Sequence, residues 1–375
     1  MTPGEHLKTY SLTELEYYKI YGRTDETQYP LPLFFNGSGI EINVTGSELW
    51  IDVEVGYDAF EPWIFTKLND SFMSRQMLTK GSYSICLFRG MSPDAVKNFK
   101  FFRELQAMSD DIHCQLLIKG FRTDGFFLPV SDKKYKLEFI GDSLTSGEGT
   151  YGAIGDNDWL PMYMSFSHDY TMMVSDVLDA EFRLISHGGW GVLCGWDNDP
   201  RHNIPSRYEQ ICGIVSGPVN EKLGALKPYR FQDWKPDAII VNLGTNDAAA
   251  FEQPAFTVPE TGETFQLRKD PDDSYNSDDI EHFEQAVIDF LCMLRRNNPE
   301  AHIVWAYGMC DYTMTFPITD AMNRYRKASG DTNIVFLQLQ ATPDEAMGSR
   351  SHPGVKMHEL AAQKISEYLR KYFES

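Results

Sequence analysis

Polar groups stand beside predicted strands and before a predicted helix in the second half of the chain, and together they could carry out acyl transfer. Ser143 lies in the segment KLEFIGDSL, a glycine-rich turn in SHGGWG, Asn246 in NLGTND and His352 in SHPG. Acyl transfer needs a nucleophilic oxygen, a base that takes its proton, and N–H donors where the oxyanion forms. Ser143 is therefore a candidate nucleophile and His352 a candidate base. The glycine-rich turn and the Asn246 amide are candidate oxyanion donors.

Each motif is also compatible with ordinary structure. A serine after a glycine is typical of a turn, and asparagine tolerates the positive φ of a tight turn. The glycine-rich turn could merely let a helix approach the sheet, and His352 could be a surface residue near the N-cap of the last helix, with Pro353 at the first helical position. All the motifs occur in order, each directly after a predicted strand or before the last predicted helix. This arrangement favours one catalytic site over a set of unrelated turns.

The chain order, with serine first and histidine last, is typical of acyl hydrolases built on α/β sheets. The turn differs from the G-x-S-x-G elbow of such enzymes, because Leu144 and Thr145 occupy the place of its second glycine. Asp142, next to the serine, is expected to accept hydrogen bonds from nearby backbone N–H groups rather than to act as a catalytic acid.

Further residues near the motifs are candidates for contacts with a substrate, namely His187, Trp190 and Asp247. Asp247 could instead brace its own turn, and His187 could contribute packing as well as a polar contact. Other aromatic residues could stack on a sugar ring, although an aromatic residue near a sheet edge belongs to the core more often. These aromatic residues are Trp196, Tyr307 and Tyr312.

The segment 196–208 carries residues that could ligate a metal ion. Asp197, Asp199 and His202 could hold a metal ion, but acidic loop residues in an acidic protein are usually solvated. We therefore predict no metal site and no cofactor.

Short apolar strands alternate with helical stretches after Tyr135, which predicts a parallel sheet covered by helices on both faces. The predicted strands are 137–140, 182–185, 238–243, 302–307 and 334–339, and the predicted helices are 169–178, 280–296 and 357–372. Residues 196–208 and 270–281 are expected to form long surface loops. Ligands of such sheets bind beyond the carboxyl ends of the strands, where the serine, the glycine-rich turn and the asparagine follow.

The first half of the chain has a different period. Between about residues 33 and 129, apolar residues recur at every second position, namely Ile40, Ile42 and Val44; Leu49, Ile51, Val53 and Val55; Tyr83, Ile85 and Leu87; and Ile112, Cys114, Leu116 and Ile118. This alternation places one face of each strand on a core and the other in water. It predicts an all-β sandwich or jelly roll.

Composition limits the partners of this 375-residue chain. The formal net charge of −20 repels phosphate backbones and anionic lipid, so neither nucleic acid nor a membrane surface is expected as a partner. The cysteines lie far apart and form no C-x-x-C pair, which argues against a zinc site and favours buried thiols in a reducing compartment. The amino-terminal segment lacks the features of a signal peptide, so a cytoplasmic location is expected, although a trimmed leader would give the same sequence.

The segments around Ser143, Gly189, Asn246 and His352 resemble the four blocks of the SGNH, or GDSL, hydrolases. KLEFIGDSLTSGEG, PSRYEQ, FQDWKPDAIIVNLGTND and RRNNPEAHIVWAYG are similar to carbohydrate esterase family two. This resemblance covers roughly residues 30 to 373. It implies a three-layer α/β/α, flavodoxin-like hydrolase domain at 134–375, preceded by a jelly-roll domain at 31–133 and an N-terminal extension at 1–30.

The resemblance implies a serine esterase that removes O-acetyl groups from sugars or oligosaccharides through an acyl-enzyme. Ser143 matches the nucleophile of the family and His352 its base. Gly189 and Asn246 match its oxyanion donors, together with the backbone N–H of Ser143. A thioesterase or lysophospholipase of the same superfamily would share these motifs. A carbohydrate-binding protein whose hydrolase half has decayed is a third alternative.

The sequence departs from the family just before the histidine. Ser349 stands where many members have an acid, and Arg350-Ser351 stands where the esterases often read Asp-Trp. Arginine carries only donors, so it cannot accept the Nδ1 proton of His352. The remaining acceptors are a backbone carbonyl of the same loop or, at longer reach, Asp344 or Glu345. We expect the carbonyl, because it requires no further ordered side chain.

Overall fold

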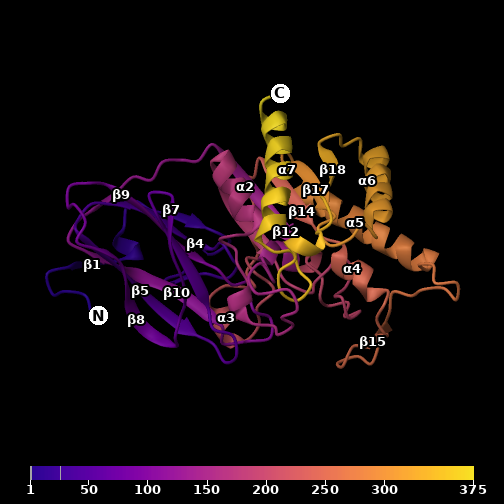
Figure 1. Ribbon diagram of the computed structural model, residues 1–375, viewed down its shortest axis with the longest axis horizontal. Helices are drawn as coiled ribbons and strands as arrows, with labels where there is room; N and C mark the ends of the chain where they lie inside the picture. The colour runs from indigo at the N-terminus through magenta and orange to yellow at the C-terminus, as the bar shows by residue number, and fades with distance from the viewer. Residues whose placement is uncertain (1, 26) are drawn as a thin grey trace.

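The computed structural model describes residues 2–25 and 27–375, which form a β-sandwich and an α/β domain packed against each other (Figure 1). The predicted fold class is confirmed in both halves. The amino-terminal half forms antiparallel sheets, and the carboxyl-terminal half forms a parallel sheet between helices.

The sandwich consists of two sheets whose inner faces share one apolar core. The first has the order β1 (Lys8–Ser11), β10 (Gln115–Thr123), β5 (Glu48–Gly56) and β8 (Gly81–Arg89), with β3 (Leu31–Pro32) on β10. The second has the order β11 (Phe127–Leu128), β4 (Gly39–Val44), β9 (Lys97–Arg103), β6 (Trp63–Leu68) and β7 (Ser71–Met77), with β2 (Lys19–Tyr21) on β4. The members of this core recur at every second position of the two strands, as their sequences predict, namely Ile40, Ile42 and Val44 in β4 and Leu49, Ile51, Val53 and Val55 in β5.

Two features of the sandwich correct the sequence-based prediction. The segment 1–30, assigned as an extension, contributes β1 and β2, which pair with β10 and β4. The predicted strand through Ile112 and Cys114 begins only at Gln115, and Ile112 is exposed. The chain before Gln115 instead forms a loop that reaches the second domain, so the apolar alternation there reflects contacts other than strand pairing.

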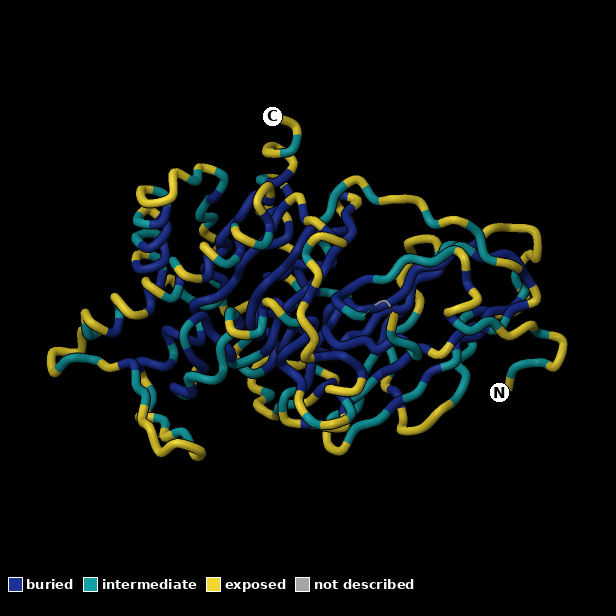
Figure 2. Tube along the Cα trace, turned by 180° about the vertical axis from the view of Figure 1, so that it is seen from behind, coloured by how far each residue is buried: buried dark blue, intermediate teal, exposed yellow. Residues whose placement is uncertain are grey.

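The α/β domain is built on a parallel sheet with the order β13 (Ala180–Ser186), β12 (Tyr135–Gly141), β14 (Ala238–Asn242), β17 (His302–Tyr307) and β18 (Ile334–Gln338). Figure 2 shows its strands as largely buried. The helices are α1 (Ser143–Ser146), α2 (Tyr170–Leu178), α3 (Pro218–Lys222), α4 (Thr245–Ala250), α5 (Ser277–Asn297), α6 (Thr315–Ser329) and α7 (Val355–Phe373). Helices α2 and α7 cover one face of the sheet, and α5 and α6 cover the other.

Short elements connect these helices and strands. They are the 3₁₀ turns η1 (Leu12–Glu14), η2 (Pro161–Tyr163), η3 (Pro205–Arg207) and η4 (Asp344–Ala346), and the hairpin β15 (Phe256–Thr257) and β16 (Thr264–Phe265). The segment 196–208 is not an exposed loop as predicted, because Asn198, Ile204 and Tyr208 are buried in it. The loop in the acidic segment 270–281 ends earlier than predicted, because Asn276 caps α5 and the helix begins at Ser277.

The two domains share a continuous interface. Tyr21, Phe65 and Phe102 of the sandwich pack in one apolar cluster with Phe166 and Phe182 of the α/β domain. Such a cluster removes aromatic surface of both domains from water, which favours a fixed arrangement of the domains.

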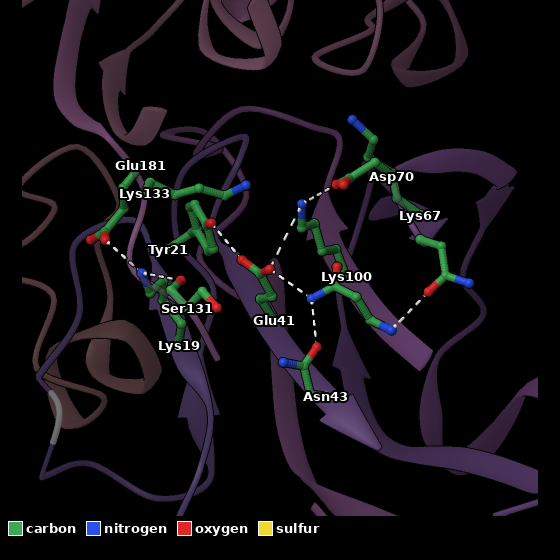
Figure 3. A network of polar contacts seen from close by, with 12 residues as sticks. Lys19, Tyr21, Glu41, Asn43, Lys67, Asp70, Lys100, Ser131, Lys133 and Glu181 are labelled. Atoms are coloured by element: carbon green, nitrogen blue, oxygen red, sulfur yellow. Dashed lines mark hydrogen bonds and ion pairs between the residues drawn. The ribbon is translucent and has the colours of Figure 1, made fainter. Parts of the chain in front are cut away.

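Polar contacts, ion pairs among them, lie around Tyr21 of this cluster (Figure 3). Lys67 Nζ lies 2.7 Å from Asp176, and Lys19 Nζ lies 3.3 Å from Glu181.

Within the described residues, no helix combines the length and the apolar character that crossing a bilayer requires.

Candidate active site

Ser143 lies at the turn between β12 and α1. A Cβ on Gly141 would collide with Thr145 Oγ1 and would lie 2.8 Å from the carbonyl oxygen of Asn242. Glycine is therefore needed for α1 to pack this closely on the sheet. Asp142 is the N-cap residue, and its Oδ1 accepts a hydrogen bond from Leu144 N at 3.0 Å, as predicted. The Ser143 hydroxyl is thereby held at the start of a capped helix.

His352 contacts Ser143 directly. Its Nε2 lies 2.9 Å from Ser143 Oγ, and its Nδ1 lies 2.8 Å from the carbonyl oxygen of Arg350. A carbonyl can only accept, so Nδ1 carries the hydrogen and Nε2 is free to accept the proton of Ser143. The prediction of a backbone carbonyl from the same loop is confirmed. Within the described residues, neither Asp344 nor Glu345 makes a hydrogen bond with this imidazole.

An uncommon backbone conformation brings this carbonyl to the ring. Arg350 and Ser351 both have φ of 56°, in the left-handed region. Non-glycine residues adopt this region at a cost of roughly 1–2 kcal/mol each. The arrangement also moves the helix start: Gly354 is the N-cap of α7, so Pro353 is not its first residue as predicted.

The Arg350 side chain ties the histidine turn to the serine helix. Its Nε donates to Glu148 Oε1 at 2.9 Å, and its Nη1 donates to the carbonyl oxygen of Asn157 at 3.0 Å. The N–H of Glu148 in turn donates to the carbonyl oxygen of Ser143 at 3.0 Å. This link joins residues that are 202 positions apart in the chain, and no local pattern of residues indicates it.

The predicted oxyanion donors lie around the serine. In the described part of the chain, the backbone N–H groups of Ser143 and Gly189 have no hydrogen-bond acceptor. Asn246 Nδ2 donates to the carbonyl oxygen of Trp190 at 3.0 Å and to Asp142 Oδ2 at 3.3 Å. Two N–H groups are thus available to an incoming oxygen, and the Asn246 amide is held beside them.

Two buried carboxyl groups lie beneath the site. Burial raises the pKa of Asp142 to about 7 and that of Asp247 to about 6. Asp247 accepts hydrogen bonds from the backbone N–H groups of Val192, Leu193 and Cys194. It therefore braces the segment that directly follows the glycine-rich turn rather than its own turn alone.

A cavity of about 660 Å³ opens over Ser143 and His352. Its wall combines residues of both domains, namely Phe60, Gln106, Met108, Ser109 and Asp110 from the sandwich and Glu148, Trp159, His187, Gly188, Gly189, Trp196, Asn246 and Arg350 from the α/β domain. Aromatic rings and polar groups both line this opening. A second cavity, of about 520 Å³ between Phe231, Asn298 and Tyr372, lies at the amino-terminal ends of the strands, away from Ser143.

The structure corrects several candidate substrate contacts. His187 and Trp196 line the cavity, but Trp190 and Asp247 do not. Trp190 is buried and stacks on the ring of His202 with a centroid distance of 5.0 Å, and Asp247 is enclosed by the hydrogen bonds described above. Tyr307 is buried as well.

The remaining candidates also lie outside the cavity. Tyr312 is exposed. Asp199 is paired with Arg201 at 2.7 Å. The sandwich residues of the cavity were not predicted, because nothing in their local sequence shows that they reach a site on another domain.

The family model of the GDSL-like lipases and acylhydrolases matches residues 137–365. Among solved structures, an acetyl xylan esterase, Est2A, from the rumen bacterium Butyrivibrio proteoclasticus is 49% identical, with a TM-score of 0.96 over 98% of this chain and 99% of that chain. A family two carbohydrate esterase from Clostridium thermocellum, in complex with cellohexaose, is 20% identical, with a TM-score of 0.79 over 95% of this chain and 99% of that chain. The second likeness shows a common fold.

Curated proteins show a similar relationship. The cellulase/esterase CelE of Acetivibrio thermocellus is 21% identical over 344 residues, which are 90% of this chain and 37% of CelE. An acetylxylan esterase/glucomannan deacetylase of Cellvibrio japonicus is 22% identical over 275 residues, which are 72% of this chain and 67% of that protein. The chain thus spans little more than a third of CelE.

Proposed function

Because the chain belongs to the GDSL-like lipase/acylhydrolase family, we propose that it is a serine esterase that removes O-acetyl groups from sugars or oligosaccharides. The observation that carries the proposal is the 2.9 Å contact between Ser143 Oγ and His352 Nε2, beside backbone N–H groups that point to no acceptor within the described residues. The likeness to an acetyl xylan esterase over nearly the whole chain supports an acetyl group and a saccharide substrate.

In the acylation step, Ser143 Oγ attacks the acetyl carbonyl carbon while His352 Nε2 takes the hydroxyl proton. The carbonyl oxygen becomes an oxyanion, which the N–H groups of Ser143 and Gly189 stabilise. The Asn246 amide adds a third donor when the oxyanion replaces Asp142 Oδ2 as the acceptor of its longer, 3.3 Å hydrogen bond. The tetrahedral intermediate then collapses. The bond to the sugar oxygen breaks, and the imidazolium gives its proton to that oxygen.

In the second half of the reaction, water attacks the acetyl group on Ser143. His352 Nε2 takes a proton from the water and returns it to Ser143 Oγ as acetate leaves. The Arg350 carbonyl keeps the Nδ1 hydrogen in place throughout. A neutral carbonyl stabilises the imidazolium less than a carboxylate does, so the pair can work as a dyad at some cost in rate.

The side chains that line the cleft favour a substrate with a polar leaving group, such as a sugar. The lining includes Trp159 and Trp196, whose rings could stack on a sugar, and Asp110, whose carboxylate could accept hydrogen bonds from sugar hydroxyls. The intact contact between Ser143 and His352 favours an enzyme over a binding protein with a decayed hydrolase half.

The test compares Ser143→Ala with Ser131→Ala, which removes an exposed hydroxyl outside the cleft. We expect Ser143→Ala to lower kcat for para-nitrophenyl acetate and for acetate release from acetylated xylan by at least ~10³-fold. Ser131→Ala should behave as the parent protein does. Acetate release by Ser143→Ala within a few-fold of the parent would contradict the assignment of the nucleophile.

A further inference from the structure

The loop between β9 and β10 of the sandwich reaches the turn that carries Gly189. Gln106 is buried in this loop, and its Oε1 accepts a hydrogen bond from the backbone N–H of Gly188 at 2.8 Å. Ser109 Oγ lies 3.2 Å from Nε2 of His187. Two hydrogen bonds therefore hold the turn from the sandwich side.

The loop that supplies these contacts is itself held firmly. Arg103 is buried, and its guanidinium donates to the backbone carbonyl oxygens of Leu105, Leu33 and Gln106 at 2.8, 3.1 and 3.0 Å. Arginine presents its donors in a rigid planar fork, so these bonds fix the loop backbone on either side of the Gln106 side chain.

The hydrogen bonds of His187 define its tautomer. Its Nδ1 lies 2.7 Å from the carbonyl oxygen of Gly188, which can only accept, so Nδ1 carries the hydrogen. Burial lowers the pKa of His187 to about 4, so the ring is neutral at pH 7 and Nε2 is an acceptor. Ser109 Oγ lies 3.2 Å from both Nε2 and Asp110 Oδ1, and its single hydrogen serves one of these acceptors at a time. Because Nε2 can only accept, the bond to the ring forms when that hydrogen points to Nε2.

These contacts act on the peptide group that contains the Gly189 N–H. The carbonyl of Gly188 and the N–H of Gly189 belong to one planar unit and point in opposite directions. Two successive glycines allow this unit to rotate widely, and Gly189 has a φ of 81°. A hydrogen bond from His187 to the Gly188 carbonyl restricts that rotation. It also polarises the peptide and makes the opposite N–H a stronger donor.

We propose that Gln106, Ser109 and His187 are positioning residues that aim the Gly189 N–H at the oxyanion, so that the sandwich takes part in catalysis. The inference rests on the proposed esterase function, because the oxyanion forms only during acyl transfer. An oxyanion donor acts mainly in the transition state, so a misdirected N–H lowers kcat and leaves KM nearly unchanged.

The experiment measures kcat and KM with para-nitrophenyl acetate for variants that lose these hydrogen bonds. His187→Leu and Gln106→Met should each lower kcat by ~10- to 100-fold, less than the ~10²–10³-fold cost of deleting a donor outright. His187→Asn places an amide N–H near the position of Nδ1, and we expect it to restore kcat to within about threefold of the parent value.

A matched control breaks a different contact between the domains. Lys67→Met removes the ion pair with Asp176, which joins the two domains outside the cleft. This variant should keep the parent kcat. Circular dichroism and thermal melting identify folded variants, and if His187→Leu does not fold, Gln106→Met decides the matter.

The outcomes separate this inference from the proposed function. Parent-like kcat in His187→Leu and Gln106→Met, with activity lost in Ser143→Ala, would overturn the positioning role and leave the esterase function intact. An equal loss in Lys67→Met would overturn it too, because general docking of the domains would explain the effect. Absence of hydrolysis by the parent protein would overturn both.

Discussion

Asp142 offers a direct test of the electrostatics beneath the candidate site. Burial raises its pKa from the ordinary value of 3.8 to about 7. Between these two values the native protein holds a proton that the unfolded chain has lost, so the free energy of unfolding falls as pH rises and levels off above about pH 7. Asp142→Asn removes this titration while keeping an oxygen that can accept from Leu144 N.

The magnitude follows from the interval between the two pKa values. One pKa unit corresponds to about 1.36 kcal/mol, so the full interval is worth about 4 kcal/mol. The chain has a pI of about 4.8, where precipitation is a hazard, so the practical range begins near pH 5.5. From about pH 5.5 to about pH 8, the unfolding free energy of Asp142→Asn should rise by about 2 kcal/mol relative to the parent.

The assay is urea unfolding followed by tryptophan fluorescence at several pH values, with parent and variant side by side. Asp279→Asn is the matched control. Burial opposes ionisation of Asp279, but hydrogen bonds from Arg268 outweigh it and hold the pKa of Asp279 below its usual range. Its difference from the parent should therefore stay constant above about pH 5.5. A constant difference for Asp142→Asn as well would refute the reasoning.

Further predictions concern the reaction. Asn246→Ala should lower kcat by ~10²-fold with little change in KM, and a raised KM with unchanged kcat would make Asn246 a substrate-binding residue instead. The protein should prefer acetyl over octanoyl esters strongly, and equal rates on para-nitrophenyl acetate and octanoate would favour a lipase-like function. Asp344→Asn and Glu345→Gln should each keep kcat within a few-fold across pH, whereas a loss of ~10³-fold in either would show that a carboxylate orients the imidazole. Arg350→Met should lower kcat about tenfold, because it frees the histidine turn from Glu148, and an unchanged kcat would show that the turn holds itself.

Local sequence was sufficient for most elements of the α/β domain. The predicted strand 238–243 corresponds to β14 (Ala238–Asn242), because a buried parallel strand is a short apolar run bounded by turn residues. Helix α6 (Thr315–Ser329) was missed, although Ile318, Ala321, Met322 and Tyr325 have helical spacing and are buried. Pro317 suggests that no helix continues through this segment, but proline is tolerated in the first turn of a helix.

The sandwich was harder to delimit. β1 (Lys8–Ser11) and β2 (Lys19–Tyr21) have too few apolar residues to show a clear period, and they are strands because they pair with β10 and β4. Their pairing partners lie about 20 to 115 residues away along the chain, so the local pattern of apolar residues does not indicate the pairing. The boundary predicted at residue 31 therefore cut through the domain.

By itself, the sequence determined most elements of the α/β domain. It also placed Ser143, Gly189 and Asn246 just after strands and His352 just before the last helix. These features depend on neighbouring residues, because strand ends and turns follow from apolar runs and glycines. Tertiary structure alone decided which side chains line the cleft.

The same distinction explains the unpredicted contacts. Gln106 reaches Gly188 from 82 residues away, and Arg350 reaches Glu148 from 202 residues away. Trp190 is buried even though it follows a strand at the reactive edge. Contacts of this kind depend on how two domains and several helix faces pack together, and packing is set by the whole chain at once rather than by any one segment.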